Sequence, residues 1–115
     1  MLERSRRYYL YDRPCDMRKS FNTLGALVTQ HMRLELLSGA GFVFINQRRT
    51  HLKLLIWEGD GFGLYYKRLE RGTFEHPAVG QDFGLSYEKL LLILQGIRTD
   101  KIEKKKRFSR PEGVG

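Results

Sequence analysis

The sequence has few of the features that mark exported or membrane-spanning proteins. Cysteine occurs once in 115 residues, at Cys15, so no intramolecular disulfide can form and the class of disulfide-stapled secreted domains is excluded. No run of about 18 or more apolar residues is present, and no apolar signal region follows the first charged residues. We therefore expect a cytoplasmic protein in a reducing compartment, with no membrane partner.

Residues for metal and nucleotide binding are also scarce. The three histidines, His31, His51 and His76, lie far apart and have no cysteine or second histidine beside them, whereas zinc sites use closely spaced ligands. The chain has no Gly-x-x-x-x-Gly-Lys phosphate loop, and the glycines of residues 59–63 fall between two predicted strands, where a hairpin turn is expected. Cys15 has no evident base beside it, and a nucleophile without a base is rarely catalytic. We expect neither a metal nor a cofactor.

Three carboxylates leave one catalytic alternative open. Asp16, Glu58 and Asp60 have the oxygen ligands that a magnesium-dependent nuclease uses. Lys53 and Lys67 are the lysines expected near them. The competing interpretation is that Asp16 caps a helix while Glu58 and Asp60 fill a turn. We favour this second interpretation, so we assign no catalytic residue and expect no enzyme, and the nuclease stays an alternative.

Positive charge is abundant and unevenly distributed. Lysine and arginine number 21 against 13 aspartates and glutamates, which gives a net charge of +8 and attracts polyanions such as nucleic acids. Residues 97–110 carry seven of the cations and two acids, and residues 1–7 carry three cations and one acid. We expect the two chain ends and the basic turn after residue 47 to gather on one side of the molecule, where they form a surface that faces a polyanion.

The spacing of apolar residues predicts an α+β fold in a single domain, residues 1–96, followed by a flexible basic C-terminal tail, residues 97–115. An aromatic strand is expected over residues 7–11. A helix is expected over residues 17–33, with Asp16 as its N-cap, because apolar residues recur there at helical spacing. The expected buried stripe of this helix comprises Met17, Phe21, Leu24, Leu27, Val28 and Met32.

Three short runs separated by turn residues predict an antiparallel β-meander, which makes about four strands with the first one. They are residues 42–47, 52–57 and 62–69. Alternation along the second run places Leu52, Leu54 and Ile56 on a core face. Residues 72–85 are expected to wander over the surface, with at most a short edge strand near Phe83.

A second helix is predicted over residues 87–94, near the C-terminus, between Ser86 as N-cap and Gly96 as the residue that ends it. This helix is apolar almost all round. It is therefore either wedged between layers of the fold or docks a partner with one side. The residues that we expect to dock a protein, or a second copy of the chain in a homodimer, are Tyr87, Leu91 and Leu94.

Cations on the predicted basic turn, on the strands beside it and at the start of the first helix have the chemistry that neutralises DNA phosphates without sequence preference. The competing interpretation is a solvated charged face. The residues that we expect to contact DNA are Arg18, Lys19, Arg48, Arg49, Lys53, Lys67 and Arg68, together with Lys101, Lys104, Lys105, Lys106 and Arg107 in the tail.

Several stretches of the sequence resemble one known family. They are Asp16-Met17-Arg18-Lys19, Phe42-Val43-Phe44-Ile45-Asn46, and the block from Lys53 to Leu69 that ends in Gly72-Thr73-Phe74. These stretches are similar to the TnpB accessory protein, the second-open-reading-frame product of bacterial insertion sequences of the IS-sixty-six type. The residues of the family motif in this chain are Asp16, Met17, Arg18, Trp57, Glu58, Asp60, Gly61, Phe62, Lys67 and Arg68.

The resemblance implies a bacterial mobile-element protein that assists DNA transposition and recombination beside a separate transposase and another accessory protein. It names a process without a mechanism. RNA-guided nucleases that share the name TnpB are several times longer, and their acidic nuclease core has no match here. Our leading hypothesis is a noncatalytic accessory factor that binds DNA through basic residues. An adaptor that docks on the transposase and a metal-dependent nuclease are the alternatives.

Overall fold

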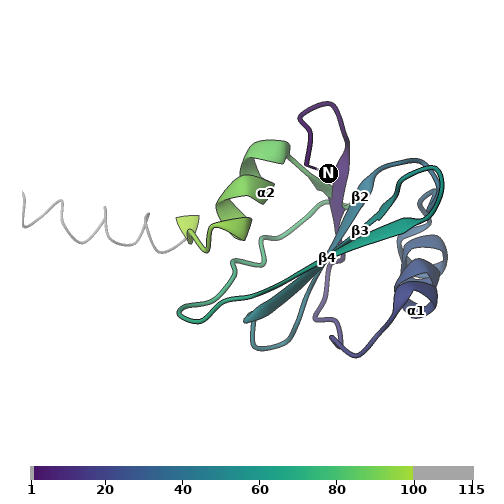
Figure 1. The fold of residues 1–115 in the computed structure, drawn as a ribbon. Helices are drawn as coiled ribbons and strands as arrows, with labels where there is room; N and C mark the ends of the chain where they lie inside the picture. The colour runs from purple at the N-terminus through teal and green to yellow at the C-terminus, as the bar shows by residue number, and fades with distance from the viewer. Residues whose placement is uncertain (1, 100–115) are drawn as a thin grey trace, which may run out of the picture.

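The computed structural model describes residues 2–99, and its α+β class agrees with the sequence prediction. One sheet has the strand order β4-β3-β2-β1-β5. Its strands are β1 (Tyr8–Leu10), β2 (Gly41–Ile45), β3 (His51–Trp57), β4 (Phe62–Arg68) and β5 (Gly84–Leu85). The helices are α1 (Phe21–Ala26), its π-helical continuation η1 (Leu27–Met32) and α2 (Tyr87–Leu94). Figure 1 shows α1 and α2 on opposite sides of the sheet.

The sheet is mixed and five-stranded, so the prediction of a purely antiparallel sheet of about four strands is corrected. The predicted meander is present as β2, β3 and β4, and the short edge strand near Phe83 is β5. However, β1 pairs parallel with β2, with Tyr8 opposite Gly41 and Leu10 opposite Val43. The connection explains this pairing, because residues 11–40 include a helix, and a crossover of that length returns the chain in the parallel direction.

Both faces of the central strands are covered, and β3 divides the core between them. Leu54 packs on one face with Leu90 and Ile93 of α2. Leu55 points to the other face and packs with Leu24 of α1. The alternation predicted along β3 is therefore confirmed. Burial on both faces also explains why the strand is nearly continuous in apolar residues.

The first helix begins at Phe21, so the predicted start at residue 17 is wrong. Ser20 occupies the N-cap position and makes no capping hydrogen bond with its side chain. Asp16 is not the cap. Its carboxylate accepts the Arg18 amide at 2.9 Å and the Arg18 guanidinium at 2.7 Å, which closes a local turn before the helix.

Lys53 supplies the physical reason for the late start. Its Nζ donates to the carbonyl oxygens of Met17 at 2.6 Å and Lys19 at 2.8 Å. A helix from residue 17 would need those same oxygens for its own hydrogen-bond ladder. Because Lys53 occupies these oxygens, the segment before Phe21 remains a loop that crosses β3.

The predicted buried stripe of the helix is correct only in part. Leu24, Val28 and Met32 are fully buried. Met17 lies outside the helix, and Phe21 is 42% exposed at the first helical position. The exposed ring of Phe21 belongs to a surface described below.

The second helix agrees with the sequence prediction. The Ser86 hydroxyl accepts the Lys89 amide at 3.1 Å, and Gly96 follows the helix with a φ of 74°. The helix buries Leu90, Ile93 and Leu94 against the sheet, which makes it a layer of the core. Its other leucines are half-buried.

The parallel pairing of β1 with β2 requires a glycine at residue 41. A Cβ atom there would lie 2.6 Å from Cδ1 of Tyr8 and 2.7 Å from its Cε1. Tyr8 cannot yield easily, because it is 3% exposed and its hydroxyl hydrogen-bonds to the main chain of Glu3. Gly41→Ala is expected to lower the free energy of unfolding in urea by about 1–3 kcal/mol. Gly61→Ala, which meets nothing within 4 Å, is the control and should change it by less than about 0.5 kcal/mol.

Candidate nucleic-acid interface

Three segments meet at one end of the sheet, and we call them together the basic end: residues 12–19, 46–51 and 68–76. The Cys15 amide donates to the Ile45 carbonyl at 2.9 Å. The Leu69 amide donates to Thr50 at 2.9 Å, and the Phe74 amide to Arg49 at 2.6 Å. In Figure 1 the turn between β2 and β3 and the segment that follows β4 lie at the same end of the sheet. The main chain therefore brings three sequence-distant segments together.

The turn between β2 and β3 is braced by Asn46. Its Oδ1 accepts the amides of Thr50 and His51, both at 2.9 Å. Its Nδ2 donates to the Thr50 hydroxyl at 3.2 Å. Arg49 adopts the left-handed conformation at a φ of 61° and donates its amide to the Asn46 carbonyl at 3.0 Å. The turn thus holds Arg48 and Arg49 in fixed, exposed positions.

Some cations of the basic end are paired with acids. Arg18 binds Asp16, and this contact lowers the pKa of the Asp16 carboxyl from 3.8 to about 2. Arg68 binds Glu70 at 3.0 Å, with both side chains largely exposed. Exposed pairs of this kind exchange readily with solvent and other anions.

Other cations of the basic end have no such partner. Within residues 2–99, the guanidinium groups of Arg48, Arg49 and Arg71 make no hydrogen bond or ion pair. All three are exposed. The basic end therefore presents guanidinium groups with all their donors available.

Lys53 and Lys67, both predicted to contact DNA, are held within the fold on opposite faces of the sheet. The Lys53 ammonium has three donors and uses two on the loop before α1, so one is left. The Lys67 ammonium donates to the Leu94 carbonyl at 2.5 Å, at the end of α2. The predicted lysines therefore do not share one surface.

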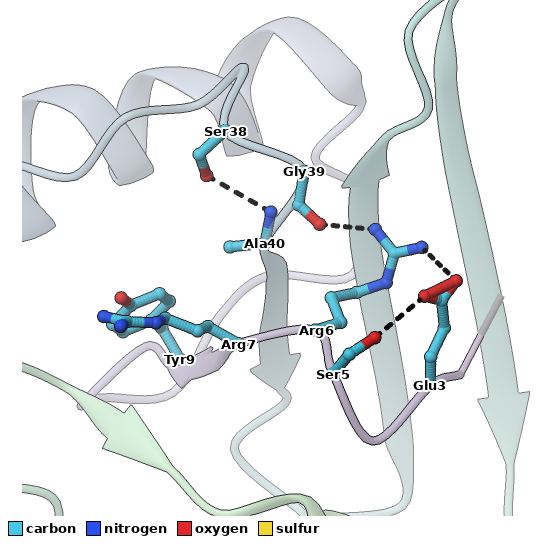
Figure 2. A pocket seen from close by; sticks show the side chains of 8 residues that line it. All are labelled: Glu3, Ser5, Arg6, Arg7, Tyr9, Ser38, Gly39 and Ala40. Atoms are coloured by element: carbon cyan, nitrogen blue, oxygen red, sulfur yellow. Dashed lines mark hydrogen bonds and ion pairs between the residues drawn. The ribbon is translucent and has the colours of Figure 1, made fainter.

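The N-terminal arginines lie at the other end of the sheet, so the expectation that both chain ends gather with the basic turn is wrong. Arg6 donates to the carbonyl of Gly39, just before β2, and pairs with Glu3 (Figure 2). These residues line a surface pocket of about 570 Å³ with Arg7. The basic turn follows the opposite end of β2.

Residues 97–99, which the sequence assigned to the tail, are attached to the basic end. The Glu75 carboxylate accepts the amide of Thr99 at 2.9 Å and its hydroxyl at 2.8 Å, and it pairs with Lys89 at 3.0 Å. Burial alone would raise the pKa of this carboxyl, but the hydrogen bonds from Thr99 and Lys89 hold it below its ordinary value of 4.5. The predicted tail contacts, Lys101, Lys104, Lys105, Lys106 and Arg107, lie outside the described residues.

Comparison with known proteins assigns the family. The model of the family described as "IS66 Orf2 like protein" matches residues 6–104. The chain belongs to the IS66 Orf2-like family. It is thus an accessory protein associated with an insertion sequence, and the resemblance stated from its motifs is confirmed.

Two proteins of Sinorhizobium fredii are similar to this chain. The protein named "Uncharacterized protein y4jC" is 32% identical over 112 residues, which cover 96% of this chain and 95% of the relative. The protein named "Uncharacterized protein y4hO" is 37% identical over 83 residues, which cover 71% of this chain and 72% of the relative. No solved structure matches the chain. No helix in residues 2–99 is long and apolar enough to cross a membrane.

The residues of the IS66 Orf2-like motif fall in two places. Asp16, Met17 and Arg18 form the loop before α1. The second set surrounds the β3–β4 hairpin, where Trp57 lies opposite Phe62 with the ring centroids 5.0 Å apart. The remaining members are Glu58, Asp60 and Gly61 in the turn, and Lys67 and Arg68 at the end of β4.

The predicted carboxylate cluster does not form a metal site. Within residues 2–99, no group of three or more His, Cys, Asp or Glu residues is arranged to hold a metal ion. Asp16 binds Arg18, as described above, whereas Glu58 and Asp60 lie in the turn between β3 and β4. This finding counts against the nuclease alternative.

The predicted docking residues of α2 differ in accessibility. Tyr87 packs its ring on Tyr8 with a centroid separation of 6.1 Å, and Leu91 is half-buried. Leu94 is 6% exposed and belongs to the core, so it is not available to a partner.

The Glu75 contacts predict an acid-sensitive attachment of residue 99. A carboxyl whose pKa is lowered by folding stabilises the protein above its ordinary value of 4.5, and this contribution is lost as the pH falls through the lowered pKa. Glu75→Gln is expected to lower the free energy of unfolding in urea at pH 7 by about 1–3 kcal/mol. The difference from the wild type should shrink as the pH is lowered from about 5 to about 3.

Glu70→Gln is the matched control for this measurement. Glu70 lies in the same segment, but its pair with Arg68 is exposed, so the free energy of unfolding should change little at either pH. An effect of Glu75→Gln that stays constant across the pH range would contradict the assignment.

Proposed function

We propose that this accessory protein is noncatalytic and binds DNA through the phosphate backbone, with the basic end as the contact surface. The observation that carries the proposal is the braced turn that presents Arg48 and Arg49. Both side chains are exposed, and their guanidinium groups make no hydrogen bond or ion pair within the described residues. Because the turn is already ordered, little conformational entropy is lost at its main chain on binding.

The surroundings of the turn support a phosphate-binding surface. Arg71 is exposed on the adjoining segment, and Lys19 lies on the segment tied to β3. Arg18 and Arg68 add charges whose present partners are exposed carboxylates. Guanidinium groups bind phosphate oxygens with two parallel hydrogen bonds, which positions a protein on DNA without reading its sequence.

The C-terminal tail extends the same surface in this proposal. Thr99 is held at the basic end by Glu75. The sequence then continues directly into the cations of residues 101–107. In this proposal the cations of residues 101–107 add phosphate contacts to the interface.

Salt dependence tests the proposed contact. Each phosphate contact contributes about 0.9 to the slope of log K against log salt concentration for duplex DNA. Arg49→Gln is expected to reduce the slope by about 0.9 for a duplex that carries the end of the insertion sequence. The slope is measured by the fluorescence anisotropy of the labelled duplex across a range of salt concentrations.

Arg33→Gln is the control for this experiment. Arg33 has nearly the same backbone conformation, with a φ of 58° against 61° for Arg49, and it is exposed outside the three segments of the basic end. The two variants change net charge equally. A slope that falls equally in both would show that net charge alone governs binding and would contradict the assigned surface.

An adaptor role is the second candidate, and α2 favours it. Leu91 is half-buried one helical turn from Tyr87, which is also half-buried, and offers an apolar contact to the transposase. Leu91→Glu is expected to reduce copurification with the transposase at least about tenfold, in line with the loss of an interface anchor. Leu37→Glu places the same charge on a leucine that is 58% exposed outside α2 and should leave copurification unchanged. Equal recovery of both variants would argue against α2 as the docking surface.

A further inference from the structure

Aromatic side chains from α1, β3 and β4 lie on the face of the sheet that α1 covers only in part. We call Phe21, Trp57, Phe62 and Tyr66 the aromatic strip. The Phe21 ring stacks on Phe62 with the centroids 6.2 Å apart, and Trp57 meets Phe62 in a T-shaped arrangement with the centroids 5.0 Å apart. Alternation along β4 places Phe62 and Tyr66 on the same face, about 14 Å apart.

The aromatic strip remains accessible because of where α1 lies. The buried side chains of α1 and η1 pack with residues of β1, β2 and β3, including Phe42 and Leu55. β4 is the outer strand of the sheet, beyond most of this cover. Phe21 is 42% exposed and Tyr66 is 52% exposed, and they are two of the three large apolar side chains exposed within residues 2–99.

Positive charge adjoins the Tyr66 end of the strip. The Lys53 Nζ lies 5.6 Å from the centroid of the Tyr66 ring, and the His51 ring stacks on Tyr66 at 5.9 Å. Lys19 is tied to Lys53 through its carbonyl, and Arg68 follows at the end of β4. The exposed parts of the Phe21 and Tyr66 rings, with cations beside Tyr66, complement a chain of flat bases joined by phosphates.

We propose that the aromatic strip binds the unpaired bases of single-stranded DNA, with Tyr66 as the principal stacking residue and Lys19 and Arg68 as phosphate contacts. This inference rests on the proposed DNA-binding function and names the form of DNA that the protein prefers. Bases within a duplex have both faces covered by neighbouring bases, so away from the duplex ends only unpaired bases can stack on Tyr66. Such stacking tolerates any sequence, because every base has a π-face.

The strip continues into the basic end, where β4 finishes. A single strand that stacks on Tyr66 therefore carries its phosphates toward Arg68 and the turn of Arg48 and Arg49. Duplex DNA, in contrast, contacts the cations of the basic end and not the aromatic strip. The two surfaces together would hold a junction between duplex and single strand.

The test compares one labelled oligonucleotide as a single strand and as a duplex, bound to the full-length protein. Tyr66→Ala is expected to weaken binding of the single strand about 5- to 150-fold, the range for loss of one stacked base. Binding of the duplex should change less than about twofold. Tyr66→Phe keeps the ring and is expected to retain binding of the single strand within about twofold, which separates stacking from the hydroxyl group.

The single tryptophan provides a second readout that does not depend on a variant. Trp57 belongs to the strip, so its fluorescence is expected to change on addition of the single strand and to stay constant with the duplex. Circular dichroism of Tyr66→Ala checks that the fold is intact.

The outcomes separate this inference from the proposed function. Duplex binding that depends on Arg49, with no preference for the single strand and no effect of Tyr66→Ala, overturns the inference alone. Failure to bind either form of DNA at low salt overturns both. A transposase that changes Trp57 fluorescence while the single strand does not would assign the strip to a protein partner and likewise overturn the inference.

Discussion

The hydrogen bonds of the Lys53 ammonium organise the face of the sheet that carries the proposed functions. They hold the loop before α1 across β3, delay the start of the helix to Phe21, and so bring the Phe21 ring onto Phe62. Both acceptors are main-chain carbonyls. Because neutral oxygens satisfy the donors without cancelling the charge, the positive charge persists beside Tyr66. The Lys53 side chain thus positions the loop before α1, sets where the helix begins and supplies positive charge beside Tyr66.

The elements that could be predicted from the sequence depend on local chemistry. The hairpin at residues 58–61 follows from its glycines, and α2 follows from Ser86 and Gly96, whose effects act within a few residues. The alternation of β3 side chains between the two faces of the sheet could also be predicted from the sequence. The parallel pairing of β1 with β2 and the start of α1 at Phe21 depend on partners more than 30 residues away, as with Lys53 and Met17. No local pattern contains that information.

The candidate site shows the same division. Arg48 and Arg49 could be identified from the sequence, because a turn between strands exposes its residues. Arg71 could not, because hydrogen bonds from Leu69 to Thr50 and from Phe74 to Arg49 place its segment beside the turn. The long side chains of Lys53 and Lys67 were assigned by charge alone, whereas their roles depend on nearby carbonyl groups. Phe21 belonged to the predicted buried stripe of the helix, and only the limited cover by α1 leaves it and Tyr66 accessible.

The contact between Glu75 and residue 99 has a mechanical consequence. Glu75 ties Lys89 of α2 and Thr99 beyond the helix to the segment that also carries Arg71, while the Lys67 ammonium ties the C-terminal end of α2 to β4. The outer side of α2 and the turn of Arg48 and Arg49 therefore belong to one stiff frame. A transposase seated on the helix and a DNA strand at the turn would be held at a set angle, so that docking of the first orients the second.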